Sequence, residues 1–271
     1  MPLRRVGDIE IYHQVYGPTD TGSPAALPVL NITGTGNDLR LSMPSRHPLN
    51  RRFQTVHFDQ RGLGQTSKPA EQWTMADYAD DAAGLLDELE IEQAHVVGTS
   101  FGGMVAQHLA LRHPTRVGRL VLACSASGGA GGASADLLAI AKMPPAEAAQ
   151  TRLTLMDQRW QSPQDVPEPL RTLFAKRAER LAVLDDDAKR GAHMQIVARA
   201  DHDTWADLHH IDNTALVIGG TYDGQAPPEN LRNLAGRLPN ATLEFFDGGH
   251  FFFTQDRTAW PRVIEFLSTS T

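Results

Sequence analysis

Short apolar runs alternate with amphipathic helical stretches in both halves of the chain. Residues 3–16 predict a β-hairpin, because Gly7-Asp8 separates two short runs and Ile9, Ile11 and His13 recur at every second position. Six further apolar runs predict strands, at 29–33, 54–58, 95–97, 117–124, 215–219 and 242–246.

Helices are predicted between these strands. Thr74 stands where a helix N-cap is expected, with Asp77 three residues later as its capping-box partner, and the helix runs to about Glu90. Three other helices are predicted. One follows the serine motif after residue 103, one begins at Pro227-Pro228, and the last has Pro261 near its start. This alternation of strands and helices predicts an α/β fold with a mostly parallel central sheet and helices on both faces.

The alternation breaks between about residues 125 and 210. This segment opens with the stretch SASGGAGGASA and continues as charged helical sequence punctuated by prolines. We interpret it as a helical cap, inserted at the carboxyl edge of the sheet between core segments 1–124 and 211–271 and setting substrate choice. The glycine-rich stretch would be a mobile entry to this lid.

Composition excludes some partners. The apolar and charged shares, 41% and 21%, are ordinary for a globular protein, and the formal net charge is −7. An acidic chain with no basic stripe argues against nucleic acid and anionic membranes as partners. No segment is long and apolar enough to cross a bilayer, and the N-terminus shows no signal-peptide pattern, so we expect a cytoplasmic protein.

The motif that carries chemistry is Gly-Thr-Ser-Phe-Gly at residues 98–102. It matches G-x-S-x-G, with a predicted strand before it and a helix after it. A sharp strand-to-helix turn needs small residues beside the serine, and it exposes the hydroxyl near the positive end of the helix. Ser100 is therefore the expected nucleophile; an ordinary serine in a glycine-rich turn is the alternative.

A serine hydroxyl needs a base, and histidine titrates near neutral pH. Of the 11 histidines, His250 is best placed, because it lies in a loop between the last strand and the last helix. Asp223, after the strand at 215–219, is the expected acid, since Ser, Asp, His is the chain order of this arrangement. Asp247 is the rival acid, although its position favours bracing the loop.

Two backbone N–H groups should form the oxyanion hole. We assign one to Phe101, directly after the nucleophile, and the other to Thr35, in the loop after strand 29–33. Apolar side chains are more often core than pocket, but some could line a substrate cavity beneath the insertion. The candidates are Met156, Trp160, Trp205 and Phe252.

Together these residues resemble the α/β-hydrolase superfamily over nearly the whole chain. Within it, the chain is similar to small cap-bearing esterases and lactonases, both 3-oxoadipate enol-lactonase-like and haloperoxidase-like. The segments that carry the likeness are the turn at 59–66, the serine loop at 98–103, the acid loop at 219–228 and the histidine loop at 249–251. One departure is Thr33-Gly34, where the family usually has His-Gly. Haloalkane dehalogenases and epoxide hydrolases would require aspartate in place of Ser100.

The sequence thus predicts a cofactor-free serine hydrolase acting on a small-molecule ester or lactone. Two alternatives remain open: a carbon–carbon bond hydrolase of a diketone-like substrate, and a non-enzymatic ligand receptor on the same fold. No metal is expected, because the cluster of histidines and aspartates at 202–210 fits no zinc-ligand spacing. Cys124, the single cysteine, is interpreted as a buried structural thiol rather than a nucleophile.

Overall fold

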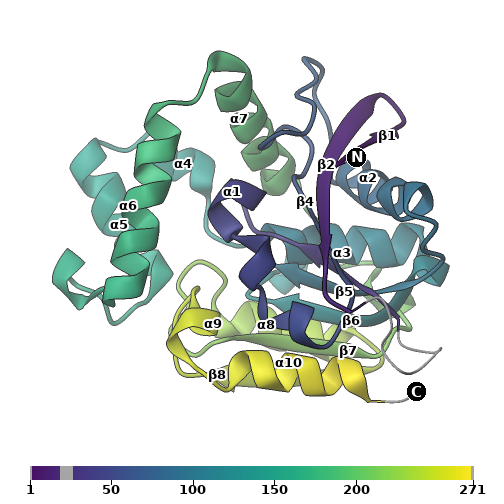
Figure 1. The fold of residues 1–271 in the computed structure, drawn as a ribbon. Coiled ribbons are helices and arrows are strands. Elements are labelled where there is room, and N and C mark those ends of the chain that lie inside the picture. Colours follow the sequence, from purple (N-terminus) through teal and green to yellow (C-terminus); the bar gives the residue numbers. More distant parts are fainter. Residues whose placement is uncertain (1, 19–26, 270–271) are drawn as a thin grey trace.

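The computed structural model describes residues 2–18 and 27–269 (Figure 1). Within these residues, eight strands form one sheet in the order β1-β2-β4-β3-β5-β6-β7-β8. β1 pairs with β2, and β2 with β4, in antiparallel fashion, while all other neighbours are parallel. The mostly parallel sheet predicted from the sequence is therefore confirmed. The strands are β1 (Leu3–Val6), β2 (Ile9–Tyr16), β3 (Val29–Ile32), β4 (Thr55–Phe58), β5 (Ala94–Thr99), β6 (Val117–Ala123), β7 (Ala215–Gly220) and β8 (Ala241–Phe246).

The parallel register brings the carboxyl ends of the central strands to one edge of the sheet. Thr99, the last residue of β5, pairs with Ala123 at the end of β6, and Ala123 pairs with Ile218 of β7. The loops that follow these strands therefore emerge side by side. In the sheet, β4 lies on one side of β3, whereas β5 and the strands after it lie on the other side. Open α/β sheets form a binding crevice at such a change in the direction of strand order.

Six α-helices of the described chain lie outside the segment between β6 and β7. The predicted N-terminus of α2 is confirmed, because Thr74 and Asp77 form a reciprocal capping box. This helix ends at Glu88, slightly earlier than expected. The six are α1 (Leu39–Ser42), α2 (Met75–Glu88), α3 (Phe101–Arg112), α8 (Pro228–Arg237), α9 (Phe252–Gln255) and α10 (Ala259–Ser268).

Each face of the sheet has its own apolar core, because successive strand residues point to opposite faces. Val96 packs on the face covered by α2, α3 and α8, whereas its neighbour Val97 packs on the face covered by α10. Burial on both faces explains why the central strands read as continuous apolar runs rather than as alternating ones.

Four helices lie between β6 and β7: α4 (Leu137–Ala141), α5 (Pro145–Met156), α6 (Glu168–Ala182) and α7 (Asp186–Ala200). Figure 1 shows them grouped to one side of the sheet. Trp160, Val166 and Leu170 form a small buried cluster among them, separate from both sheet cores. We call residues 124–214 the α4–α7 segment. No helix in the described part of the chain is both long and apolar enough to cross a membrane.

The glycine-rich stretch that opens this segment is packed, in contrast to the expected loose entry. Gly128 has φ +72°, and a Cβ there would lie 2.0 Å from the carbonyl oxygen of His202. At Gly131 an added Cβ would meet the Ser127 hydroxyl and the Trp205 ring. Glycine is needed here because neighbouring backbone approaches closely, which gives the stretch a packing role.

Candidate active site

Ser100 sits at a strained turn between β5 and α3. Its φ and ψ are 55° and −116°, a conformation that L-residues rarely adopt. The turn is possible because its neighbours lack side chains: a Cβ at Gly102 would lie 2.1 Å from the carbonyl oxygen of Ile32, and one at Gly98 would lie 2.4 Å from that of Gly102. The predicted strand–serine–helix arrangement is present.

Ser100, His250 and Asp223 form a chain of hydrogen bonds, although 150 residues separate the serine from the histidine. Oγ of Ser100 lies 3.0 Å from Nε2 of His250, and Nδ1 of His250 lies 2.7 Å from Oδ2 of Asp223. Asp223 is fully buried, and its other oxygen accepts backbone N–H groups from Gln225 and Ala226 at 2.8 and 2.9 Å. The carboxylate is thus held to face Nδ1, which leaves Nε2 facing the serine.

Asp247, the rival acid, lies away from this chain. Its carboxylate forms an ion pair with Arg159, at 2.8 Å between Oδ1 and Nη1, and its side chain is 75% exposed. Its backbone N–H donates to Asp256. These contacts match the bracing role considered from the sequence.

The loop after β3 lies directly against the serine. A Cβ added to Gly34 would be 3.4 Å from Cβ of Ser100. The N–H of Phe101 opens α3, and in the described structure neither this N–H nor that of Thr35 donates to a protein acceptor.

Side chains from the α4–α7 segment hold this loop. Oε1 of Gln195, in α7, accepts the N–H of Gly36 at 2.7 Å, and Arg177, in α6, donates to the carbonyl oxygen of Thr35 at 2.8 Å. Gln195 is fully buried. The sequence analysis missed both contacts, although a glutamine within the run Met194–Val197 is a signal of a buried polar group.

The turn at residues 59–66 also holds the loop after β3, through hydrogen bonds to Thr33 and Leu39. Asp59 accepts the N–H groups of Leu39 and Gln65 at 2.7 and 2.8 Å, and burial raises the pKa of its carboxyl group. Gln60 donates to the carbonyl oxygen of Thr33 at 2.9 Å. The resemblance in sequence placed this turn near the site. Its side chains position the backbone of neighbouring loops and take no part in the proposed reaction.

The C-terminal end of α5 contacts the loops of both the histidine and the acid. The N–H of His250 donates to the carbonyl oxygen of Met156 at 2.6 Å, and the N–H of Gly224 donates to that of Leu155 at 3.1 Å. Behind them, Gln255 accepts the N–H of Gly249 and donates to the buried carboxylate of Asp157. The α4–α7 segment is therefore part of the frame that positions His250.

Gln225 is a further residue at the site that the sequence analysis did not single out. Its amide nitrogen lies 2.8 Å from Nε2 of His250, on the atom that also faces Ser100. The side chain is almost fully buried, and its backbone carbonyl accepts the N–H of Ala135 at 2.8 Å. No motif marks it; the only signal is its position two residues after Asp223.

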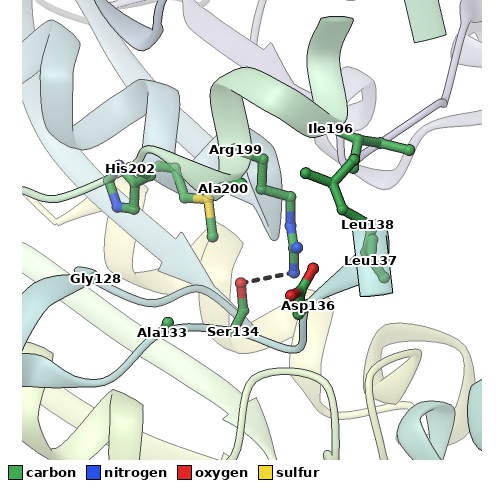
Figure 2. A pocket seen from close by; sticks show the side chains of 11 residues that line it. Gly128, Ala133, Ser134, Asp136, Leu137, Leu138, Ile196, Arg199, Ala200 and His202 are labelled. Carbon is green, nitrogen blue, oxygen red and sulfur yellow. Dashed lines mark hydrogen bonds between the residues drawn. The ribbon is translucent and has the colours of Figure 1, made fainter. Parts of the chain in front are cut away.

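A cavity of about 190 Å³ opens between α4, the C-terminal end of α7 and the loop before α4. Figure 2 shows Arg199 reaching across it to Ser134, with Leu137, Leu138 and Ile196 along one side. None of the three residues Ser100, Asp223 and His250 lines this cavity. Ala135, which lies between the lining residues Ser134 and Asp136, donates its N–H to the carbonyl oxygen of Gln225.

Three of the four side chains predicted to line a pocket occupy other positions. Trp160 is buried in the cluster of the α4–α7 segment, which Met156 borders, and Phe252 is fully buried in the core beneath α10. Trp205 packs against Gly131 and the guanidinium of Arg237. This corrects the pocket prediction for Trp160, Trp205 and Phe252, whose apolar rings pack against neighbouring side chains or backbone instead of lining the cavity beside α4. Met156 is partly buried and lies beside His250, so its place in a substrate pocket stays a prediction.

Possible metal ligands do not gather at residues 202–210. His202 contacts His108 and the carbonyl oxygen of Ala126, while His209 and His210 contact each other. Within the described residues, three potential ligands converge only at Cys124, Asp223 and His250. Burial raises the pKa of the Cys124 thiol, which keeps it protonated, and the other two are already bonded to each other.

Comparison with known proteins identifies similar chains. The family model described as "alpha/beta hydrolase fold" matches residues 28–256. A poly(3-hydroxyalkanoate) depolymerase of Ectopseudomonas oleovorans is 30% identical over 255 residues, which cover 91% of this chain and 86% of that protein. A hydrolase from Pseudomonas aeruginosa is 27% identical, with a TM-score of 0.79 and 98% of both chains covered. The enol-lactonase of Burkholderia xenovorans shares the fold, at 23% identity and a TM-score of 0.79, over 99% of this chain and all of that one.

Proposed function

The chain belongs to the α/β-hydrolase fold family and is a hydrolase, and from this premise we propose that it cleaves a small carboxylic ester or lactone through an acyl-enzyme on Ser100. The observation that carries the proposal is the continuous hydrogen-bonded path from Ser100 through His250 to buried Asp223. It is the arrangement that activates a hydroxyl nucleophile.

In the acylation step, Nε2 of His250 accepts the proton of Ser100 as Oγ attacks the carbonyl carbon. Asp223 fixes the tautomer with the proton on Nδ1 and stabilises the imidazolium that forms. The bond from the acyl carbon to the leaving alcohol then breaks, and His250 protonates that oxygen. For a lactone, the alcohol stays attached to the acyl group.

The tetrahedral intermediate carries a negative oxygen, which the N–H groups of Phe101 and Thr35 would stabilise. Removing one such donor typically lowers turnover by about 10²–10³-fold. Gln195 and Arg177 bind the backbone of Gly36 and Thr35, so the α4–α7 segment helps to keep the N–H of Thr35 in place. This supports a division into a core of 1–124 and 211–271 and a cap of 125–210.

The test is covalent labelling combined with a substrate panel. A fluorophosphonate should add once to the protein, at Ser100, and Ser100→Ala should prevent labelling and reduce kcat on the order of 10⁵–10⁶-fold. Esters, lactones and diketones assayed side by side identify the substrate class. Labelling at another residue, with the alanine variant still active, would refute the role of Ser100; turnover of diketones alone would replace the ester proposal with carbon–carbon bond hydrolysis.

A further inference from the structure

Gln225 faces the one atom of His250 through which every proton transfer of the proposed reaction passes. Its amide nitrogen lies 2.8 Å from Nε2, compared with 3.0 Å for Oγ of Ser100. The backbone of Gln225 is held on both sides, because its N–H donates to Asp223 and its carbonyl accepts from Ala135. The carboxamide therefore has a defined position at the site.

The imidazole has a single lone pair at Nε2 when Nδ1 carries the proton. Two donors, the serine hydroxyl and the Gln225 amide, share it in the resting structure. Asp223 occupies the opposite, Nδ1 side of the ring. Any third group that exchanges a proton with Nε2 must therefore come in beside Ser100, where the carboxamide lies.

That third group is required in the second half of the reaction. A water must approach within hydrogen-bond distance of Nε2 and also reach the acyl carbon on Oγ of Ser100. We propose that Gln225 is a positioning residue for this hydrolytic water, an inference that rests on the proposed function. A carboxamide suits the task because its N–H donates to the water oxygen and its C=O accepts a water proton.

The water oxygen bonds to the acyl carbon while one of its protons passes to Nε2 of His250. The bond from the acyl carbon to Oγ of Ser100 then breaks, and Nε2 returns its proton to Oγ, which releases the acid and the free enzyme. Gln225 gains and loses no proton; it holds the water in line with the acyl carbon.

The experiment separates this role from general damage to the site. The acyl-enzyme is formed with p-nitrophenyl butyrate, and its decay is followed by intact mass in water and with added hydroxylamine. Hydroxylamine is a stronger nucleophile that depends less on a positioned base. In Gln225→Met we expect decay in water to slow on the order of 10- to 100-fold, as for a misplaced reactant, while decay by hydroxylamine changes less than about threefold.

Gln225→Asn keeps the carboxamide but withdraws it by one methylene, and it should show the same selective loss if the methionine variant does not fold. Gln14→Met is the matched control, because it removes a partly buried carboxamide from β2 that contacts Tyr12; both decay rates should remain those of the parent. Equal losses with both nucleophiles, or unchanged decay in water, would overturn the inference. Failure of the parent to acylate at Ser100 would instead overturn the proposed function.

Discussion

The backbone N–H of His250 donates a 2.6 Å hydrogen bond to the carbonyl oxygen of Met156, the last residue of α5. This bond ties the loop of the histidine to the α4–α7 segment. Phe251, the next residue, extends the link by packing edge-on against Phe174 of α6, with ring centroids 5.2 Å apart. The position of His250 therefore depends on the integrity of a segment that lies outside the sheet.

Trp160→Ala should test this dependence. The side chain is 4% exposed and is one of the three buried members of the cluster that Met156 and Phe251 border. Its removal should lower the free energy of unfolding by roughly 3–5 kcal/mol and reduce kcat, because the carbonyl that holds His250 loses its support. Thermal unfolding and steady-state kinetics measure the two effects.

Leu181→Ala is the control, since this α6 residue is 47% exposed and its loss should change stability by less than about 0.5 kcal/mol. A Trp160→Ala protein that is destabilised but keeps full kcat would show that the α4–α7 segment does not position the histidine.

The two candidate acids should respond differently to amide substitution. Asp223→Asn should lower kcat by roughly 10⁴-fold, because the amide favours the wrong imidazole tautomer. Asp247→Asn removes only an exposed ion pair with Arg159, which contributes at most about 1 kcal/mol, and should leave kcat nearly unchanged. The measurement is kcat of both variants on the same ester. A larger loss in Asp247→Asn than in Asp223→Asn would make Asp247 the acid that orients His250.

Activity should survive dialysis against EDTA. The proposed reaction draws its base, nucleophile and oxyanion donors from the protein itself. Steady-state rates before and after dialysis, with and without added Zn²⁺ or Mg²⁺, provide the measurement. Loss of activity that a divalent ion restores would mean that a metal takes part.

Stability should fall as the pH falls from about 6.5 to 4. Burial lowers the pKa of His202 to about 3 and that of His108 to about 4, with the charges of Arg199 and Arg112 adding to the effect. The unfolded chain titrates these groups near 6.5, so it binds protons in this range that the folded protein does not. Each histidine then costs about 1.4 kcal/mol of stability per pH unit.

Urea unfolding at several pH values tests this prediction with the double variant His108→Gln, His202→Gln. His47, His57 and His95, whose pKa values burial also lowers, remain in both proteins and contribute equally. The slope of stability against pH should therefore be shallower in the variant than in the parent. Identical slopes would show that the two imidazoles bind as many protons in the folded protein as in the unfolded chain, which would contradict their lowered pKa values.

Local chemistry made much of the fold predictable. Alternating apolar residues marked the N-terminal hairpin, and short apolar runs marked the other strands. Thr74 and Asp77 marked the start of α2, and the small residues around Ser100 marked the sharp turn after β5. These signals depend on backbone sterics and on neighbours a few residues apart, so they can be read without a structure. The mostly parallel sheet follows from the alternation of such elements.

Other relationships required the tertiary structure. Asp223 and Asp247 both follow strands near the histidine, and only the folded loops place one against Nδ1 and the other against Arg159. The sequence does not indicate whether the apolar residues of the α4–α7 segment pack together or line a cleft. In the structure, Trp160 packs against other residues of this segment. Met156 acts through a carbonyl oxygen that every residue possesses, and Gln225 through a side chain whose direction depends on Asp223 and Ala135. Composition and periodicity cannot encode such contacts, because they arise between residues far apart in the chain and depend on strand register and loop geometry.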